Sequence, residues 1–327
     1  MQIIERKFLN PITPTCHASS FDFYKDKIIF SWFGGTKEGH PDSSIYIKNL
    51  SDKLVVLGDK DSIPRWNPVV MTHNGRVCLW SKSGIFCDRW QTFLHDITDW
   101  DKWTTRKEKE ELKNILPAGL NGPVKNKPII LDDKIICGSS VETMYDWSSY
   151  IEEYSLKNKK LKFINRSKPI TVDKKRYYHP LSGSLKVSMG IIQPSLFYDG
   201  ETLHALFRSC YGYETAFYAK LLDGEWTKPR QINLLNPNSS LDCVFHKGYL
   251  YVCYNPSSIK RTPLVVAKFL LQNGLLKKID QIIISDMAES PITDQLSYPF
   301  MRLKDDRLHL TYTYGRINIE YCCIDNL

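Results

Sequence analysis

The stretch "QPSLFYDGETLHALFRSC" (residues 193–210) contains two apolar runs separated by the polar turn Asp199-Gly200. An Asp-Gly or Asn-Gly pair between apolar runs supplies the positive φ angles of a short turn, so this stretch predicts a β-hairpin. The same pattern returns five more times along the chain. Its other turns are Lys25-Asp26, Asn74-Gly75, Asp132-Asp133, Lys247-Gly248 and Asp305-Asp306.

The spacing of the six turns indicates a propeller. One marker residue per turn, at positions 26, 75, 133, 200, 248 and 306, gives separations of 49, 58, 67, 48 and 58 residues with a mean of 56, which is typical of propeller blades. A third strand is expected after each hairpin, and several are followed by the polar turn that precedes a fourth strand. The expected third strands are Ser44–Lys48, Ile85–Asp88, Tyr150–Tyr154, Ala216–Leu221, Leu264–Phe269 and Ile317–Cys322.

The sequence therefore predicts an all-β fold, a six-bladed β-propeller of four-stranded antiparallel sheets. Because the repeats run from end to end, residues 1–327 are expected to form a single domain. The first hairpin begins only at Ser20, which leaves the apolar segment Gln2–Leu9 without a partner. Since an unpaired edge strand is a liability, we expect this segment to pair with the sheet of the last repeat and close the ring.

Composition narrows the classes of function. The formal net charge of +8 admits anionic partners. The most basic stretches, Lys102–Lys113 and Lys157–Lys168, lie between repeats, so we interpret them as outer loops rather than nucleic-acid-binding patches, with a short surface helix in the first. No run approaches the ~18 apolar residues of a membrane span.

Cysteine usage and the N-terminal segment point to a reduced protein without a metal. The nine cysteines are odd in number and show no C-x-x-C spacing, so we expect neither a disulfide framework nor a metal site, and no cofactor. The first twenty residues do not resemble a secretory signal, which predicts a cytoplasmic location. The oligomeric state is left open.

Polar residues stand at equivalent points of every repeat. In a propeller, the ends of the second strands and the loops before the first strands meet at one mouth of the central channel. After the second strands come Glu38, Asp42, Lys82, Glu142, Arg208, Asn255, Arg261 and Arg316. Before the first strands come Trp66, Asn67, Lys125, Lys127, Gln193, Asn238, Asp242 and Tyr298. Because unpaired desolvated charge is costly, such a convergent cluster predicts a site for a polar ligand.

Carboxyl groups beside arginines suit the cleavage of a glycosidic bond. One protonated carboxyl group gives its proton to the leaving oxygen, and a second group attacks the anomeric carbon or activates water. The planar fork of arginine holds a carboxylate in bidentate fashion. The implied substrate is therefore an acidic sugar or oligosaccharide.

The chain resembles the sialidase-like propellers with BNR-type repeats. The resemblance runs through ten ordered segments: "HASS" (17–20), "WFGGTKEG" (32–39), "WNPV" (66–69), "LPAGLNGPVKNKPI" (116–129), "SSVE" (139–142), "QPS" (193–195), "NPNSSLD" (236–242), "RTPL" (261–264), "SYP" (297–299) and "YTYGR" (312–316). The N-terminal F-R-I-P motif of the family is missing, and its Asp-boxes remain only as traces such as "LLDGEWT" (221–227).

The resemblance implies roles for individual residues. The family has an early acid, a middle glutamate, two later arginines and a tyrosine nucleophile, with a further arginine near the N-terminus. This chain offers a parallel order of Asp42 or Glu38, then Glu142, Arg208, Arg261, Tyr298 and Arg316, whereas Arg6 is a poor stand-in for the N-terminal arginine. Asp42 or Glu38 is then the proton donor, and Glu142 draws the phenolic proton of Tyr298 so that this oxygen attacks. The remaining predicted ligand-binding residues are His17, Trp66, Asn67, Lys125, Lys127, Gln193, Asn238, Asp242 and Asn255.

Two other functions fit the same residues. In a polysaccharide lyase acting on a uronate-containing glycan, Tyr298 or His17 would remove the proton beside the carboxylate while arginines neutralise it. In a carbohydrate-binding propeller the cluster would hold a sugar without turnover, because the fold alone implies no activity.

Overall fold

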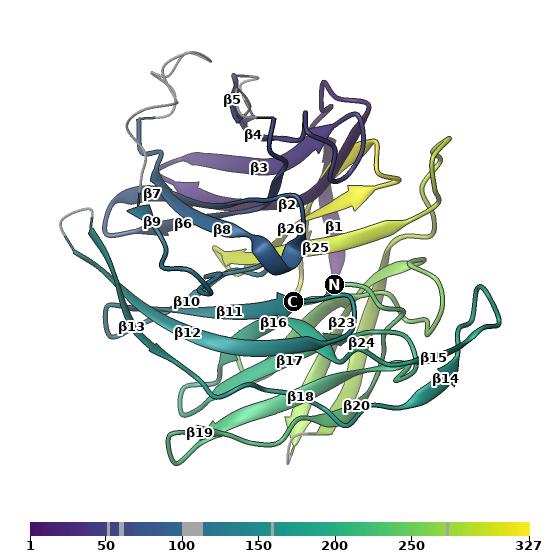
Figure 1. Cartoon of the computed structure of the whole chain (residues 1–327). Coiled ribbons are helices and arrows are strands. Elements are labelled where there is room, and N and C mark those ends of the chain that lie inside the picture. Colours follow the sequence, from purple (N-terminus) through teal and green to yellow (C-terminus); the bar gives the residue numbers. More distant parts are fainter. Residues whose placement is uncertain (51–52, 59–61, 100–113, 158–159, 273–274) are drawn as a thin grey trace.

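The computed structural model describes residues 1–50, 53–58, 62–99, 114–157, 160–272 and 275–327. Six antiparallel sheets are arranged around a central axis as the blades of a β-propeller (Figure 1). The predicted fold is confirmed. All of residues 102–113, where a short surface helix is expected, lie outside the described part of the chain.

The first three blades each contain four strands in chain order, from the channel outward. Blade 1 consists of β2 (Thr15–Tyr24), β3 (Lys27–Gly35), β4 (Ser44–Asn49) and β5 (Leu54–Leu57). Blade 2 consists of β6 (Arg65–His73), β7 (Arg76–Ser83), β8 (Gln91–Asp96) and β9 (Asn114–Ile115). Blade 3 consists of β10 (Ile129–Leu131), β11 (Lys134–Glu142), β12 (Trp147–Lys157) and β13 (Lys160–Arg166).

The second half of the ring follows the same plan. Blade 4 consists of β16 (Ile191–Tyr198), β17 (Leu203–Ser209), β18 (Thr215–Leu222), β19 (Glu225–Trp226) and β20 (Arg230–Leu235). Blade 5 consists of β21 (Asp242–His246), β22 (Tyr249–Tyr254), β23 (Leu264–Gln272) and β24 (Leu275–Ser285). Blade 6 consists of β25 (Leu296–Lys304), β26 (Arg307–Tyr314), β27 (Asn318–Asp325) and the N-terminal strand β1 (Gln2–Phe8).

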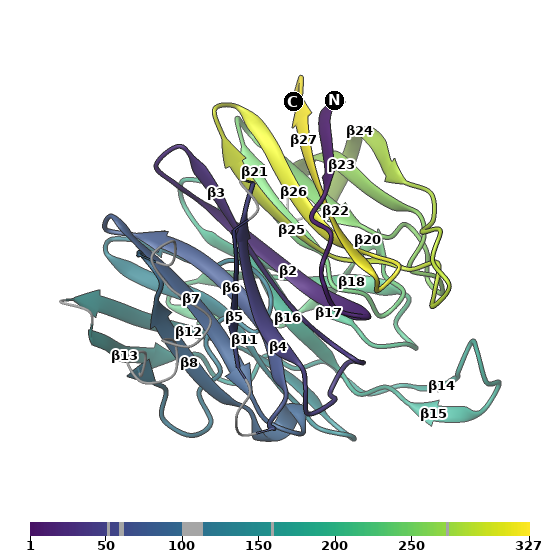
Figure 2. The ribbon, with the colours of Figure 1, turned by 90° about the horizontal axis from the view of Figure 1, so that it is seen from above.

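The N-terminal strand closes the ring as expected. β1 pairs antiparallel with β27, with Gln2 opposite Asp325 and Phe8 opposite Glu320. Figure 2 shows the two chain ends side by side on this blade. The outermost position of blade 6 is therefore filled by the start of the chain, and β27 is not left as an edge.

The hairpin turns adopt the backbone angles that their sequences predict. Asn74 and Gly75 have φ angles of 49° and 69°, and Asp132 and Asp133 have φ angles of 48° and 60°. Residues of these types tolerate the left-handed region better than others, which is why they recur in two-residue turns. All six turns lie at one end of the ring. The loops that join second to third strands lie at the opposite end, which we call the mouth.

One expected strand is wrong. Residues Ile85–Asp88 were predicted as the third strand of blade 2, but β8 begins at Gln91, and Cys87–Arg89 forms the 3-10 turn η1. Ile85 and Phe86 are 64% and 62% exposed, whereas Leu94 on β8 is buried. The apolar pair at 85–86 resembles a strand in the sequence, but its side chains face solvent at the mouth.

A small hairpin stands outside the blades. β14 (Arg176–Tyr178) and β15 (Leu185–Val187) pair only with each other, within the connection from blade 3 to blade 4. Figure 2 shows this hairpin projecting beyond the ring. We call residues 174–188 the arm. The sequence pattern of the repeats did not predict it.

The core lies between neighbouring sheets. Large aromatic side chains such as Trp32, Trp80, Tyr154 and Tyr321 are almost fully buried there. All nine cysteines are free thiols, and eight of them are buried. Within the described ranges, no helix is long and apolar enough to cross a membrane.

Candidate functional site

Four of the six inner strands carry the same irregularity close to the mouth. In β2, β6, β16 and β25, two residues face one residue of the second strand, so each strand contains a β-bulge. The bulged residues Ala18, Asn67, Gln193 and Tyr298 have φ angles of 52°, 33°, 54° and 57°. Bulges redirect side chains and are common beside active sites. The equivalent positions explain how residues from distant repeats come together.

Tyr298 is held by two hydrogen-bond donors from blade 4. Arg208 donates through Nη1 to the Tyr298 hydroxyl oxygen at 2.9 Å, and Gln193 donates through Nε2 to the same oxygen at 3.3 Å. The side-chain oxygen of Gln193 accepts a further bond from Arg208 at 3.0 Å, which fixes the orientation of its amide. The two hydrogen bonds fix the position of the phenolic oxygen between blades 4 and 6. Blade 4 therefore positions a side chain that belongs to blade 6.

Arg208 and Arg261 meet at Asn238. Nε and Nη2 of Arg208 donate to the Asn238 side-chain oxygen at 3.1 and 2.9 Å, and Nη2 of Arg261 donates to the Asn238 backbone oxygen at 2.7 Å. Burial, followed by the nearby charge of Arg208, lowers the pKa of Arg261 to about 10. Among the described residues, no carboxylate forms a salt bridge with either guanidinium group. The two cations therefore lie around a neutral residue, and an anion would compensate them.

Arg316 lies on the blade 6 side of the same cluster and is paired with Glu38 of blade 1 through Nη1 and Oε2. Burial, followed in order by Arg316, Arg261 and Arg208, lowers the pKa of His17 well below its ordinary value. All three arginines thus act on one buried imidazole. The structure brings the arginines into one neighbourhood, although Arg316 already has a carboxylate partner.

His17 packs directly on Tyr298, with 4.0 Å between the ring centroids. Its Nδ1 lies 3.0 Å from the hydroxyl oxygen of Thr313, which also accepts a bond from the backbone N–H of Ala18 at 3.2 Å. His17 is 1% exposed. The imidazole therefore supports the tyrosine ring from beneath. Sequence reasoning missed Thr313, although it occupies the end of the second strand, as Arg208 does in blade 4.

The three candidate carboxyl groups have different surroundings. Burial raises the pKa of Glu142, although Arg208 and a hydrogen bond from Ser140 act against it. Hydrogen bonds from Thr36, above all, hold the pKa of Asp42 below its ordinary value. The Asp42 carboxylate also lies 2.7 Å from Nδ1 of His40, so it closes its own exposed loop. Unlike Asp42, Glu142 has surroundings that favour a bound proton at the mouth.

Lys127 and Asp242 lie inside the channel rather than at the mouth. Asp242 is fully buried, and its two oxygens lie 2.8 and 2.9 Å from Nζ of Lys127. The same carboxylate accepts bonds from Ser195 at 2.6 Å and from the backbone N–H of Met301 at 2.7 Å. Blades 3, 4, 5 and 6 are joined at this one group. The hydrogen bonds of this pair go to protein atoms, so its role is to hold the blades together.

Lys125 has a similar place beside this pair. It is 2% exposed, its Nζ donates to the backbone oxygen of Pro299 and to Asn126, and burial lowers its pKa to about 7. Its ammonium also lies 6.0 Å from the centre of the Tyr298 ring. Lys125 therefore supports the inner strand that carries Tyr298 and is not exposed to a ligand at the mouth.

Three further residues that the sequence predicts as ligand-binding form hydrogen bonds that hold loops at the mouth in place. Trp66 donates to the backbone oxygen of Gly84 at 2.6 Å, and Asn67 donates to that of Val124 at 2.9 Å. Asn255 donates to the backbone oxygens of Pro263 and Leu296 at 2.9 and 3.0 Å. All three side chains are buried. Their hydrogen bonds position neighbouring segments, and their predicted contact with a ligand stays a prediction.

Two more polar groups belong to the neighbourhood. Lys82, which sequence reasoning placed at a strand end without a role, is fully buried, and its Nζ donates to the backbone oxygen of Pro123 at 2.6 Å. Burial lowers the pKa of Lys82 to about 7. Gln295 accepts a long bond of 3.4 Å from Arg261. Its position just before the first strand of blade 6 is the signal that would have identified it.

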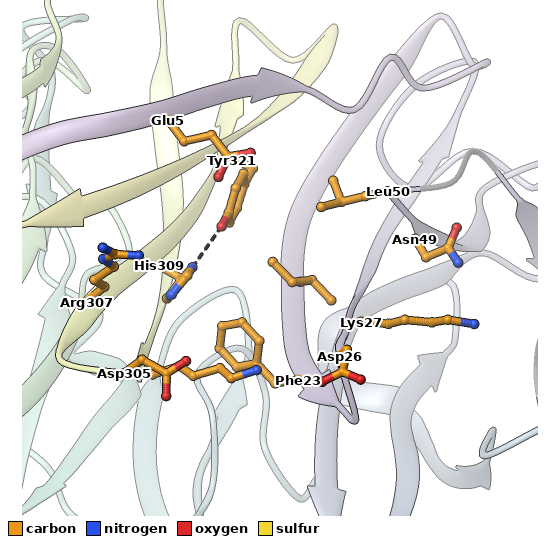
Figure 3. Close-up of a pocket in the computed structure, with 12 residues that line it drawn as sticks. Glu5, Phe23, Asp26, Lys27, Asn49, Leu50, Asp305, Arg307, His309 and Tyr321 are labelled. Atoms are coloured by element: carbon orange, nitrogen blue, oxygen red, sulfur yellow. Dashed lines mark hydrogen bonds between the residues drawn. The ribbon is translucent and has the colours of Figure 1, made fainter.

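A separate pocket opens at the opposite end of the ring. It has a volume of about 520 Å³ and lies between blades 1 and 6, near the turns that contain Asp26 and Asp305 (Figure 3). Lys27 and Arg307 line it together with these carboxylates. Its charges are mixed, and it shares no residue with the arginine cluster. No group of three or more His, Cys, Asp or Glu side chains in the described ranges is placed to hold a metal ion.

Comparisons with solved structures show the same fold in known proteins. Trypanosoma rangeli sialidase in complex with the inhibitor DANA matches with a TM-score of 0.65 at 9% identity, over 98% of this chain and 60% of that one. A further structure of Trypanosoma rangeli sialidase matches with a TM-score of 0.62 at 10% identity, over 99% and 58%. The chain thus spans less than two thirds of the length of these sialidases.

A protein of similar length also matches. The subtype N10 neuraminidase-like protein of A/little yellow-shouldered bat/Guatemala/060/2010 has a TM-score of 0.58 at 7% identity, over 99% of both chains. At these identities the likeness concerns the fold. The search of curated proteins finds no match. The model of the BNR repeat-like domain matches residues 26–310, which is most of the chain. With its six-bladed ring and this match, the chain belongs to the BNR repeat-like domain family.

Proposed function

We propose that the chain is a sialidase-like glycoside hydrolase that acts on an acidic sugar at the mouth of the ring. The observation that carries the proposal is the hydroxyl oxygen of Tyr298, which accepts hydrogen bonds from Arg208 and Gln193 beside two arginines without a carboxylate partner. The matched sialidases support the proposal through their fold.

The counts of N–H donors suggest where the carboxylate of the sugar binds. Arg208 already makes four hydrogen bonds, to Asn238, Gln193 and Tyr298. Arg261 makes two, of which one is long, and a guanidinium group has five N–H donors. Arg261 therefore has the larger free capacity and is the main carboxylate ligand in this proposal. Arg208 instead orients the tyrosine.

The proton transfers follow from the surroundings of the carboxyl groups. Tyr298 attacks the anomeric carbon through its oxygen and transfers its proton to Glu142, and a covalent glycosyl-tyrosine forms as the leaving group departs. The carboxylate of the sugar takes the place of Glu38 on Arg316, and the released Glu38 carboxylate takes a proton from solvent water and passes it to the leaving oxygen. Asp42 has no part in these steps, because its oxygens are held by its own loop.

The test measures turnover and binding separately. The substrates are fluorogenic glycosides of N-acetylneuraminic acid and of glucuronic acid, and binding of the free sugars is followed by calorimetry. Tyr298→Phe and Glu142→Gln are expected to lower kcat by about 100-fold or more while the Kd stays within a few-fold. Asp42→Asn is the matched control, since it removes a carboxylate from the same mouth without removing a proposed proton carrier. Full turnover by both Tyr298→Phe and Glu142→Gln would refute the mechanism.

Two outcomes favour the alternative functions. A product that contains a new carbon–carbon double bond would identify a lyase, in which the same tyrosine oxygen removes a proton beside the carboxylate. Binding of a sugar without turnover of either glycoside would favour a carbohydrate-binding propeller. In both cases Arg261→Lys is expected to weaken binding, because lysine cannot hold a carboxylate with two parallel bonds.

A further inference from the structure

The arm turns an apolar face toward solvent. In the β14–β15 hairpin, Tyr178 pairs with Leu185 and Arg176 pairs with Val187. Because side chains alternate along a strand, these four lie on one face and Tyr177 lies on the other. Tyr178, Leu185 and Val187 are 74%, 59% and 54% exposed. A hairpin at the surface of a soluble protein normally turns its polar face to solvent and its apolar face to the core.

The other face of the arm is fastened to the mouth. The ring of Tyr177 packs against Gly212, where an added Cβ would lie 2.7 Å from it. The ring of His179 lies 4.9 Å from that of Tyr211, which follows the strand that carries Arg208. The exposed orientation of the apolar face is therefore set by packing, and the arm is not a loose loop.

A neighbouring loop extends this surface. Met144 and Tyr145, between β11 and β12, are 79% and 77% exposed. Lys174 joins the loop to the arm, because its Nζ lies 2.8 Å from Asp146 and donates to the backbone oxygen of Tyr145 at 3.1 Å. We call the combined set the arm surface: the apolar residues Met144, Tyr145, Tyr178, Leu181, Leu185 and Val187, the basic residue Arg176 on the same face of the hairpin, and the neighbouring basic residues Lys174, Lys175 and Lys186.

The arm surface agrees with a wider asymmetry of the ring. Among the described residues, each exposed large apolar side chain outside a strand lies in a loop at the mouth end: Ile12, Ile85, Phe86, Met144, Tyr145, Leu181, Ile259, Met287 and Ile292. The end that carries the hairpin turns has no such loop residue in the described ranges. Exposed apolar side chains gathered on one face mark an interaction surface.

The charges of the arm identify the partner. Residues 174–188 contain four cationic side chains and no carboxylate, and one of the four, Lys174, pairs with Asp146 of the neighbouring loop. A second copy of the chain docked through the same face would bring together six cations that have no carboxylate partner in the described part of the chain, Lys175, Arg176 and Lys186 from each copy, which like-charge repulsion opposes. A dissolved polyanion would pair with the cations but would leave the leucine, valine and tyrosine side chains in water. The surface of an anionic bilayer accepts both kinds of group, with tyrosine at the headgroup level and leucine below it.

We propose that the arm surface docks the protein on an anionic lipid bilayer, with the mouth of the ring facing the membrane. Leu181, at the tip of the arm and 71% exposed, enters the acyl boundary. Arg176, on the apolar face, contacts the lipid headgroups, and the long side chain of Lys186, which starts from the opposite face beside Tyr177, reaches them past the edge of the two-stranded hairpin. The cluster around Tyr298 then faces glycans that are carried by lipids. The docking itself does not depend on the proposed hydrolysis.

The test is sedimentation of the full chain with vesicles. Vesicles of equal parts phosphatidylcholine and phosphatidylglycerol are compared with vesicles of phosphatidylcholine alone. The protein is expected to sediment with the anionic vesicles, less so as salt is added. The double variant Arg176→Gln, Lys186→Gln should bind about fivefold more weakly per charge removed. Leu181→Asp should weaken binding to the anionic vesicles by about tenfold or more, because a charge replaces the leucine that is buried in the bilayer.

Matched controls come from the outer strand of blade 5. Leu275 has the same exposed fraction as Leu185, 59%, and Lys277 is exposed on the same strand. Leu275→Asp and Lys277→Gln are expected to leave vesicle binding unchanged. Equal sedimentation with neutral and anionic vesicles, or an unchanged Leu181→Asp variant, would overturn the proposal. So would a dimer of the parent protein that Leu181→Asp converts to a monomer in light scattering.

Discussion

Replacing Asp242 should destabilise the whole ring. Its carboxylate is fully buried and accepts hydrogen bonds from Lys127, from Ser195 and from the backbone N–H of Met301, so it connects four blades. Asp242→Asn leaves the Lys127 ammonium buried without its counter-charge. Removing one partner of a buried ion pair costs about 3–5 kcal/mol, which is a large part of the ~5–15 kcal/mol that stabilises a typical domain.

Urea unfolding followed by tryptophan fluorescence measures this loss. Lys127→Met should cost a similar amount, and the double variant should cost clearly less than the two losses added together, because it removes both charges. Burial alone would raise the pKa of Asp242, but Lys127 and Lys125 outweigh it and hold the pKa below its ordinary value. The Asp242 carboxylate therefore stabilises the ring fully at pH values above its pKa in the unfolded chain. This stabilisation is lost as the pH falls through the lower pKa that Asp242 has in the folded chain. A loss of less than about 1 kcal/mol in Asp242→Asn would refute the reasoning.

Two further predictions concern other parts of the ring. Gly212→Ala should lower Tm and speed tryptic cleavage of the arm, because Gly212 has a φ of +99° and the added Cβ would clash with Tyr177. The control is Gly183→Ala, which also has a positive φ (+65°) but has no atom of the described residues near its added Cβ. This control should not speed tryptic cleavage of the arm. His309 lies within hydrogen-bond distance of the Tyr321 hydroxyl group (Figure 3). Burial lowers the pKa of His309 from 6.5 to about 4. The free energy of unfolding should therefore fall as the pH drops from about 6.5 toward 4. His309→Gln should flatten that dependence in thermal melts, and an NMR titration of His309 with a midpoint near 6.5 would contradict the account.

The repeat pattern was sufficient to predict the fold. Turn residues such as Asn74-Gly75 fix both the position and the type of each hairpin, and their spacing then determines the number of blades. The pairing of β1 with the last blade could be predicted because an unpaired edge strand is a liability. The pattern failed at Ile85 and Phe86, because a short apolar run in a loop cannot be distinguished from a short strand by its composition.

The candidate site was predictable in its location and less so in its roles. The ends of second strands identified Arg208, Arg261 and Arg316, since equivalent positions of a ring converge. The sequence did not separate the mouth from the channel interior, which differ by a few residues along one strand. Asp242 therefore looked like a ligand-binding residue, and only its burial and its bonds to other blades show its structural place.

The pairing of β1 with β27 has a consequence for how the chain folds. Arg6 and Glu320 form an ion pair across 314 residues of sequence, so β1 can pair only after β27 has been synthesised. Until then, five blades can form from local hairpins, whereas the sixth lacks its outer strand. Contacts this distant in sequence are slow to form. We expect ring closure to be the late step of folding, during which the bare edge of β27 is open to pairing with other chains.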